Sequence, residues 1–568
     1  MERIWLKSYR PGMATDIDPA ALPSLRHMAE QSFAAFKDRA AYIQMGQHLS
    51  YGDLDRKSRD FAAWLQNVAG LKRGDRLGIM LPNVLQYPIA MFAALRAGFT
   101  VVNTNPLYTA PELEHQLRDA GCLAIVVLEN FAHVLEAVLP RTQVRHVITT
   151  SVGELLGFPK SVAVNFVVRK VHKQVPPWNI PGAIGFGAVL AAGREHALAA
   201  VDLNHEDIAF LQYTGGTTGV AKGAVLTHGN ICANVLQASA WIDPFLPRAH
   251  EQEQYLVTPI PLYHIFALTA NCMLFLRLGW TNVLITNPRD FPRFVAELKR
   301  YPFAYLSGVN TLFNALLHTS DFGSVDFSHL KITLGGGMAV QEAVARRWKA
   351  ATGNPITQAW GLTETSPGAC INLPFEDFNG SIGLPIASTE ISIRDDAGGE
   401  LALGSVGEIC VRGPQVMRGY WNRPDETALV MLPDGWLRTG DIGRMDERGY
   451  VYIEDRKKDM ILVSGFNVYP NEVEAVVAAI PGVVEAAAVA QADEHSGEVV
   501  AVFVVTKDPS LTERAIIDKC RESLTGYKLP RHVYFRSELP KSNVGKILRR
   551  VLRDSLVQPQ GSIGSAQQ

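Results

Sequence analysis

The sequence predicts an α/β fold with a large amino-terminal body of parallel α/β subdomains, a small β-barrel-like subdomain, and a small α+β domain at the carboxyl end. The body is predicted by the alternation of short β-branched runs with helical stretches, as in 76–81, 87–98, 100–103, 111–121 and 123–128. Such alternation is typical of parallel strands joined by helical crossovers.

Two later changes of pattern predict the other parts. After about residue 380 the chain has short strands and Gly-rich turns, as in 390–413, which indicates an antiparallel barrel or sheet. Further on we expect a helix over 471–480, two strands within 486–505, and helices over 512–524 and 545–556.

The boundaries follow from these patterns. We expect an amino-terminal domain over 1–454 and a carboxy-terminal domain over 460–557. The charged run at 455–459 is the expected linker, and 558–568 is an expected disordered tail because it has nothing to bury.

Composition excludes several classes of function. The chain has 54 Lys and Arg against 56 Asp and Glu, a net charge of −2, so no overall field attracts nucleic acid. The six cysteines form no CxxC pair, which argues against a zinc site and favours a cytoplasmic protein. Two uncharged stretches, 77–95 and 255–276, could span a membrane by length, but proline and polar residues in both favour buried strand–loop–helix units.

The segment 155–180 combines apolar and basic residues and leaves two alternatives open. It lies on the anionic cytoplasmic face of a membrane as a peripheral contact, or it is a helix packed on the body. The residues concerned are Val164, Phe166, Val167, Val168, Lys160, Arg169, Lys170 and Lys173. The sequence also leaves a homodimer open.

A Gly- and Thr-rich string at 213–224 is the strongest chemical signal. Its glycines let the backbone approach an anion while N–H and hydroxyl groups point at it, and its lysine adds a positive charge. It is not a Walker A loop, because no Gly directly precedes the lysine and no Ser or Thr follows it. The predicted phosphate-binding residues are Thr214, Gly215, Gly216, Thr217, Thr218, Gly219 and Lys222.

This string resembles the phosphate loop of the adenylate-forming superfamily of acyl-CoA synthetases, luciferases and peptide-synthetase adenylation domains. Four further motifs of that superfamily follow in order, at 358–367, 438–441, 454–474 and 539–550. Within the superfamily the chain is most similar to bacterial long-chain fatty acyl-CoA synthetases. Two residues depart from the usual pattern: Trp360 replaces a Tyr, and Ala339 replaces a Pro.

The resemblance implies a nucleotide site. Glu364 and Thr214 would ligate Mg²⁺, and Asp441 with Arg456 would hold the ribose. The purine would lie against backbone with an indole on its face. The further residues that the resemblance places beside the nucleotide are Gly336, Gly337, Trp360, Gly361 and Thr363.

The resemblance also implies two half-reactions at one site. Lys546 would act on the carboxylate and α-phosphate during adenylation, and His264 would stand in the wall of the acyl pocket. The carboxy-terminal domain would then rotate about Lys458 and bring Gly465 to the pantetheine channel. The implied substrates and cofactors are a fatty acid, ATP, Mg²⁺ and coenzyme A.

The sequence therefore predicts an ATP-dependent fatty acid:CoA ligase for long-chain acids that works through an acyl-AMP. Two alternatives stay open: a ligase for aryl or shorter carboxylates, including one that passes the acyl group to a carrier protein, and a catalytically inactive, membrane-associated relative that binds adenylate. The inactive relative would be expected to lack Lys546 or Glu364, and both are present.

Overall fold

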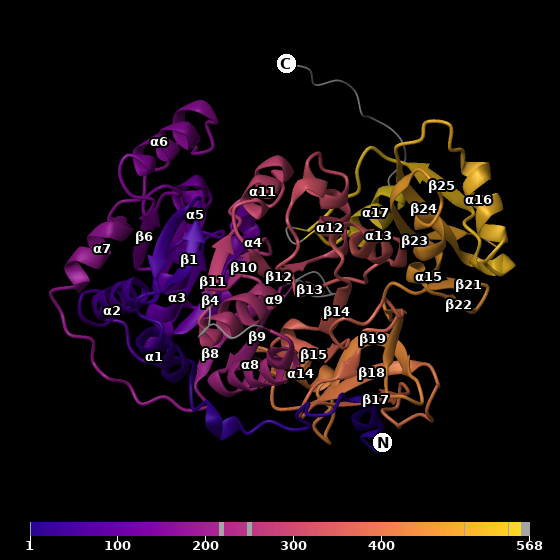
Figure 1. Cartoon of the computed structure of the whole chain (residues 1–568), viewed down its shortest axis with the longest axis horizontal. Helices are drawn as coiled ribbons and strands as arrows, with labels where there is room; N and C mark the ends of the chain where they lie inside the picture. The colour runs from indigo at the N-terminus through magenta and orange to yellow at the C-terminus, as the bar shows by residue number, and fades with distance from the viewer. Residues whose placement is uncertain (1, 215–220, 247–252, 494, 543–544, 558–568) are drawn as a thin grey trace.

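The computed structural model describes residues 2–214, 221–246, 253–493, 495–542 and 545–557. Most of the predicted phosphate loop, from Gly215 to Gly219, lies outside this part of the chain, as does the predicted tail. The described chain forms four sheets (Figure 1), and the α/β fold class is confirmed.

The first sheet of the body has seven strands, in the order β7-β6-β5-β3-β4-β8-β9. All neighbours are parallel except β8 and β9. The strands are β3 (Arg76–Met80), β4 (Thr100–Asn103), β5 (Cys122–Leu128), β6 (His146–Thr150), β7 (Ile184–Gly185), β8 (Ile208–Thr214) and β9 (Lys222–Thr227). The helices of this part are α1 (Leu25–Ala35), α2 (Tyr51–Asn67), α3 (Gln86–Arg96), α4 (Ala110–Ala120), α5 (Ala132–Val138), α6 (Lys160–Phe166), α7 (Phe186–Gly193) and α8 (His228–Ile242).

Local sequence explains these elements. α4 begins at a capping box made by Thr109 and Glu112 and ends at Gly121, whose φ of 64° suits glycine. Every residue of α3 is buried, so it can be apolar on all sides. The uncharged stretch 77–95 is therefore a buried strand–loop–helix unit, as predicted, and no helix in the described chain is both long and apolar enough to cross a membrane.

The second sheet of the body has nine strands, in the order β16-β15-β14-β13-β12-β10-β11-β1-β2. Its central strands are parallel, and antiparallel pairs close both edges. The strands are β1 (Ala40–Gln44), β2 (Gln47–Ser50), β10 (Tyr255–Thr258), β11 (Thr281–Leu284), β12 (Phe303–Gly308), β13 (Ile332–Gly335), β14 (Ile356–Gly361), β15 (Gly368–Ile371) and β16 (Leu384–Pro385). The helices are α9 (Ile265–Ala267), α10 (Leu274–Leu278), α11 (Phe291–Leu298), α12 (Asn310–Leu317) and α13 (Glu342–Thr352).

The predicted barrel or sheet is a four-stranded antiparallel sheet, in the order β17-β18-β19-β20. It consists of β17 (Glu390–Arg394), β18 (Gly407–Arg412), β19 (Leu437–Met445) and β20 (Val451–Arg456), with α14 (Pro424–Val430) between β18 and β19. The amino-terminal segment lies beside it in Figure 1, where the Ser8 hydroxyl donates to the Arg448 carbonyl at 2.7 Å.

The fourth sheet has five strands and is the last in the chain. Its strands are β21 (Ile461–Val463), β22 (Phe466–Val468), β23 (Val483–Asp493), β24 (Gly497–Thr506) and β25 (His532–Phe535), with helices α15 (Pro470–Ala478), α16 (Glu513–Arg521) and α17 (Arg549–Val557). The predicted mixture of strands and helices is confirmed. The last helix, however, begins at Arg549 and not at Gly545, because Gly545 has a φ of +83° and its carbonyl accepts a bond from Thr311 of α12 at 3.0 Å.

Candidate active site

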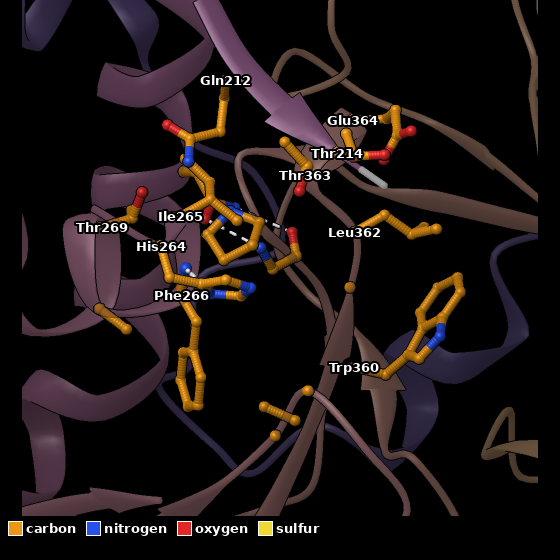
Figure 2. A pocket seen from close by; sticks show the side chains of 18 of the residues that line it. Gln212, Thr214, His264, Ile265, Phe266, Thr269, Trp360, Leu362, Thr363 and Glu364 are labelled. Atoms are coloured by element: carbon orange, nitrogen blue, oxygen red, sulfur yellow. Dashed lines mark hydrogen bonds between the residues drawn. The ribbon is translucent and has the colours of Figure 1, made fainter. Parts of the chain in front are cut away.

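A cavity of about 770 Å³ is lined by residues of the seven-stranded, nine-stranded and four-stranded sheets and of the loop before α17. Figure 2 shows part of its lining. The predicted residues that line it are Thr214, Lys222, His264, Gly336, Gly337, Trp360, Gly361, Thr363, Glu364, Arg456 and Lys546. Asp441 contacts two of these residues, as described next, whereas Lys458 and Gly465 are not among the lining residues. One cavity thus gathers residues more than 300 positions apart.

Asp441 is buried at the base of this cavity and has a donor on each carboxylate oxygen. The Trp360 indole N–H donates to Oδ2 at 2.9 Å, and Arg456 Nε lies 2.9 Å from Oδ1. Asp441 and Arg456 are opposite each other in the β19–β20 register, so the sheet itself sets this ion pair. The Trp360 bond was not foreseen in the sequence, where only stacking was expected of the indole.

Glu364 lies on a 3₁₀ turn, η9 (Thr363–Thr365), and both Glu364 and Thr214 line the cavity (Figure 2). Its Oε1 accepts a hydrogen bond from the Tyr420 hydroxyl at 2.7 Å. Burial is the main cause of the raised pKa of Tyr420, and the negative charge of Glu364 raises it further. Tyr420 therefore keeps its proton and donates to the carboxylate. Sequence reasoning missed it, because 56 residues separate the two side chains.

Lys222 also reaches this corner of the cavity. Its ammonium pairs with Glu426 of α14 and lies 5.3 Å from the centre of the Tyr420 ring. Lys222 was predicted to bind a phosphate group. In this structure its negatively charged partner is the carboxylate of Glu426.

Lys546 enters the cavity without a carboxylate partner among the described residues. The positive charge of Arg456 is the largest cause of the lowering of its pKa to about 8, and burial adds to it. His264 is nearby: burial, and then the charge of Lys546, lower its pKa to about 4. At pH 7 the imidazole of His264 is therefore neutral, whereas most of the Lys546 amine is protonated and carries a positive charge.

Glycines allow close approach on two sides of the cavity. A Cβ on Gly336 would lie 3.2 Å from the Ala359 carbonyl oxygen and 3.3 Å from the Phe266 ring, and Gly337 has a φ of +77°. On the facing side, a Cβ on Gly545 would lie 2.7 Å from Thr311 Oγ1. The loop that carries Lys546 therefore needs glycine to dock on α12 in this pose.

Apolar side chains also line this cavity. They include Ala238, Ile242, Ile265, Leu274, Tyr305 and Val309. His264, which was expected in the wall of the acyl pocket, lines the same cavity. The cavity thus combines a cationic, hydroxyl-rich part with an apolar part.

Charge pairs also hold the junction between the four-stranded and five-stranded sheets. Arg549 donates to Glu474 at 2.8 Å and to Asn471 at 2.6 Å, and it lies 3.4 Å from Asp455. Burial raises the pKa of Asp455 to about 6, although Arg549 opposes this shift. Three residues after Lys546, this arginine ties the loop of Lys546 to the end of β20.

Two of the expected site residues stand apart from the cavity in this pose. Lys458 follows β20 and is exposed. Gly465 has a φ of +83° in the exposed turn between β21 and β22, where a Cβ would contact nothing within 4 Å. The structure therefore brings Lys546, but not Gly465, to the cavity.

The site and fold define a class of proteins that related sequences identify directly. Residues 29–421 match the AMP-binding enzyme family, and residues 472–546 match the AMP-binding enzyme C-terminal domain. The chain belongs to the AMP-binding enzyme family. The resemblance to adenylate-forming enzymes is therefore confirmed.

Curated relatives narrow the class. The chain is 54% identical to a long-chain-fatty-acid–CoA ligase of Escherichia coli O157:H7 over 556 residues, which are 98% of each chain. It is 37% identical to a ligase of the same name from Bacillus subtilis, over 97% of this chain and 98% of that one.

Solved structures share the fold. The ATP-bound MatB of Rhodopseudomonas palustris superposes with a TM-score of 0.79 at 26% identity, over 93% of this chain and 98% of that chain. An anthranilate CoA ligase, AuaEII, in complex with anthranoyl-AMP has a TM-score of 0.84 over 95% of this chain and 99% of its own, and its 24% identity carries the fold alone.

The geometry predicts how Lys546 titrates. Replacing Arg456 with Met removes the nearest positive charge and leaves Asp441 without its cation, and both changes favour the protonated amine, so we expect the pKa of Lys546 to rise from about 8 toward the ordinary lysine value. NMR of ¹³C-dimethylated lysines measures this directly, with the signal of Lys546 assigned by its absence from Lys546→Arg.

Arg444→Met is the matched control for this titration, because Arg444 pairs with Glu454 outside the cavity at 3.2 Å. It should leave the midpoint of Lys546 near pH 8. Equal midpoints in the Arg456 and Arg444 variants would contradict the electrostatic account of this site.

Proposed function

We propose that this chain is an ATP-dependent long-chain fatty acid:CoA ligase, which converts a fatty acid, ATP and CoA into acyl-CoA, AMP and pyrophosphate through an acyl-AMP. The observation that carries the proposal is the 54% identity to a long-chain-fatty-acid–CoA ligase over 98% of both chains. The cavity supports it, because a cationic end and an apolar end suit a triphosphate and an alkyl chain.

The nucleotide occupies the cationic end. Lys222 exchanges its pair with Glu426 for phosphate oxygens, and the hydroxyl of Thr214 donates to them. Asp441 accepts the ribose hydroxyls, held in place by Trp360 and Arg456. The close approach at Gly336 leaves the purine room to lie against backbone.

Glu364 and Thr214 fit a Mg²⁺ ion. A single carboxylate beside a hydroxyl suits an ion that keeps most of its waters and binds substrate phosphates, and the described residues contain no group of three His, Cys, Asp or Glu that would hold a metal alone. When bound, the ion neutralises charge on the phosphate oxygens. The Tyr420 hydroxyl holds the orientation of Glu364 for this task.

Adenylation uses the pose that the structure has. The acyl chain fills the apolar region, which aims its carboxylate at the α-phosphate. The ammonium of Lys546 holds oxygens of both groups and stabilises the charge that they share as the carboxylate attacks and pyrophosphate leaves. The neutral His264 lines this space without adding a second positive charge.

Thioester formation needs a different pose. Gly465 lies in an exposed turn away from the cavity here, so the five-stranded domain rotates about Lys458 to bring this turn to the acyl-AMP and to withdraw Lys546. The thiol of CoA then attacks the acyl carbon and AMP leaves.

The homodimer stays a prediction.

The substrate assignment is tested by AMP release across straight-chain acids from acetate to oleate, with benzoate as the aryl comparison. We expect AMP release to depend on both ATP and CoA and kcat/KM to rise with chain length toward the long acids, because each buried methylene contributes about 0.8 kcal/mol. A maximum at benzoate or acetate would replace the proposal with the aryl or short-acid alternative.

The two half-reactions should separate by mutation. Lys546→Ala removes the cation that adenylation needs, so we expect acyl-AMP formation to fall by at least about 100-fold while supplied acyl-AMP and CoA still give acyl-CoA. Lys458→Pro fixes φ at the hinge, and we expect the opposite defect.

Rapid-quench assays of each half-reaction measure both variants, with Lys457→Ala as the control beside the hinge. Equal loss of both half-reactions in each folded variant would overturn the alternation of poses.

The Tyr420 hydroxyl should matter for magnesium. Tyr420→Phe removes one hydrogen bond to a carboxylate, worth about 1.5 to 3 kcal/mol when charged, so we expect the Mg²⁺ concentration for half-maximal adenylation to rise about tenfold or more. Tyr452→Phe is the control, since its hydroxyl bonds Asp446 at 3.3 Å away from the cavity. A magnesium titration of Tyr420→Phe that matches the control would remove Tyr420 from the site.

A further inference from the structure

A second surface, far from the cavity, carries an unusual concentration of exposed apolar side chains. It comprises residues 158–173, which contain α6 and the following π-helix η5 (Val167–Val171), and neither helix has a buried residue. The exposed fractions are 88% for Phe158, 61% for Val162, 60% for Phe166, 38% for Val167 and 60% for Val171. In Figure 1 α6 projects from the edge of the body, on the side away from the five-stranded domain.

The polar contacts of this segment point inward. The Asn165 Oδ1 accepts from the Gly153 N–H at 2.8 Å, and Arg169 Nη2 donates to the buried Glu129 at 2.6 Å. The Lys160 ammonium donates to the Met45 carbonyl. The helix is thus fastened to the body by these polar side chains and by Val164, while most of its large apolar side chains face out, which is unusual for a surface helix.

Charge on the outward face is positive. Lys170 and Lys173 are exposed, have no ion pair among the described residues, and flank the exposed Val171 and His172 at the end of the segment. The whole segment contains no Asp or Glu. Of the four basic residues noted in the sequence, Lys160 and Arg169 are occupied by the body, so these two lysines are the ones left to meet a partner.

We propose that residues 158–173 form a docking surface for an anionic lipid bilayer. Phe158, Val162 and Phe166 enter the boundary between headgroups and acyl chains, while Lys170 and Lys173 reach lipid phosphates. Val164 packs against the core of the body, whereas the side chains of Phe158, Val162 and Phe166 are exposed. Binding needs neither the cavity nor a substrate, so the inference stands apart from the proposed ligase activity.

A second copy of the chain fits this surface poorly. In a two-fold dimer the same patch meets itself, and Lys170 and Lys173 would face their own copies with no acidic residue in the segment to balance them. A bilayer that carries negative phosphates meets both the apolar and the basic part of the surface at once.

The test is sedimentation of the full chain with vesicles of phosphatidylcholine and phosphatidylglycerol, compared with phosphatidylcholine alone. We expect binding to the anionic vesicles, and a loss of at least about tenfold in the triple variant Phe158→Ser, Val162→Ser, Phe166→Ser. Lys170→Gln and Lys173→Gln should each weaken binding about fivefold, equivalent to about 1 kcal/mol per charge, and only with anionic lipid.

The matched control removes three exposed apolar side chains from other surfaces: Val68→Ser, Leu403→Ser and Val406→Ser. It should bind as the unchanged chain does. AMP release with octanoate, a soluble acid, should be equal in all variants and shows that each is folded, whatever the vesicles report.

Three results would overturn the proposal: no binding of the unchanged chain to anionic vesicles, equal loss in the control triple, or unchanged vesicle binding by the Phe158, Val162, Phe166 variant. Analytical ultracentrifugation accompanies the vesicle assay. A dimer that the same triple variant dissociates, with vesicle binding intact, would assign the surface to a second copy.

Discussion

Five cationic side chains of the described chain line one cavity, and the arrangement of the site depends on how their repulsion is balanced. Arg456 pairs with Asp441, Lys222 with Glu426, and both Arg438 and Lys457 with Glu408. Lys546 has no carboxylate within ion-pair distance among the described residues. Its pKa falls to about 8 because the neighbouring guanidinium disfavours a further charge. The ammonium of Lys546 is thus the cation to which an anionic substrate group would add a counter-charge.

The sequence predicted those parts of this site that belong to short contiguous motifs. Glu364 lines the cavity and Asp441 contacts two residues that line it, and each belongs to a motif that is one turn or strand end whose neighbours fix its conformation. The partners were not predictable, since they come from elsewhere in the chain. Tyr420 reaches Glu364 through a loop after β18, and the bond from Trp360 to Asp441 depends on how two sheets meet.

The fold was predictable for the same reason, and the prediction was wrong where tertiary contacts decide the local conformation. Alternating strands and helices of the body, and the helices and strands after residue 459, repeat the pattern in the sequence. The final helix was expected from Gly545, which has good helical neighbours, but its docking on Thr311 forces a positive φ and delays the helix to Arg549. The outward face of residues 158–173 also needed the structure, because composition alone could not say which side met the body.

The five-stranded domain keeps its own interior. Both of its hydrophobic clusters consist of residues between 461 and 556, and neither includes a side chain of the body. The contacts that fasten it in this pose are polar bonds, such as Asn314 to the Val484 carbonyl at 3.1 Å, and charge pairs, such as Arg549 with Asp455 at 3.4 Å. Because the core of the domain is complete without the body, breaking these contacts would leave that core intact, and dissolved salt, which screens charge pairs, would set how firmly the domain is held.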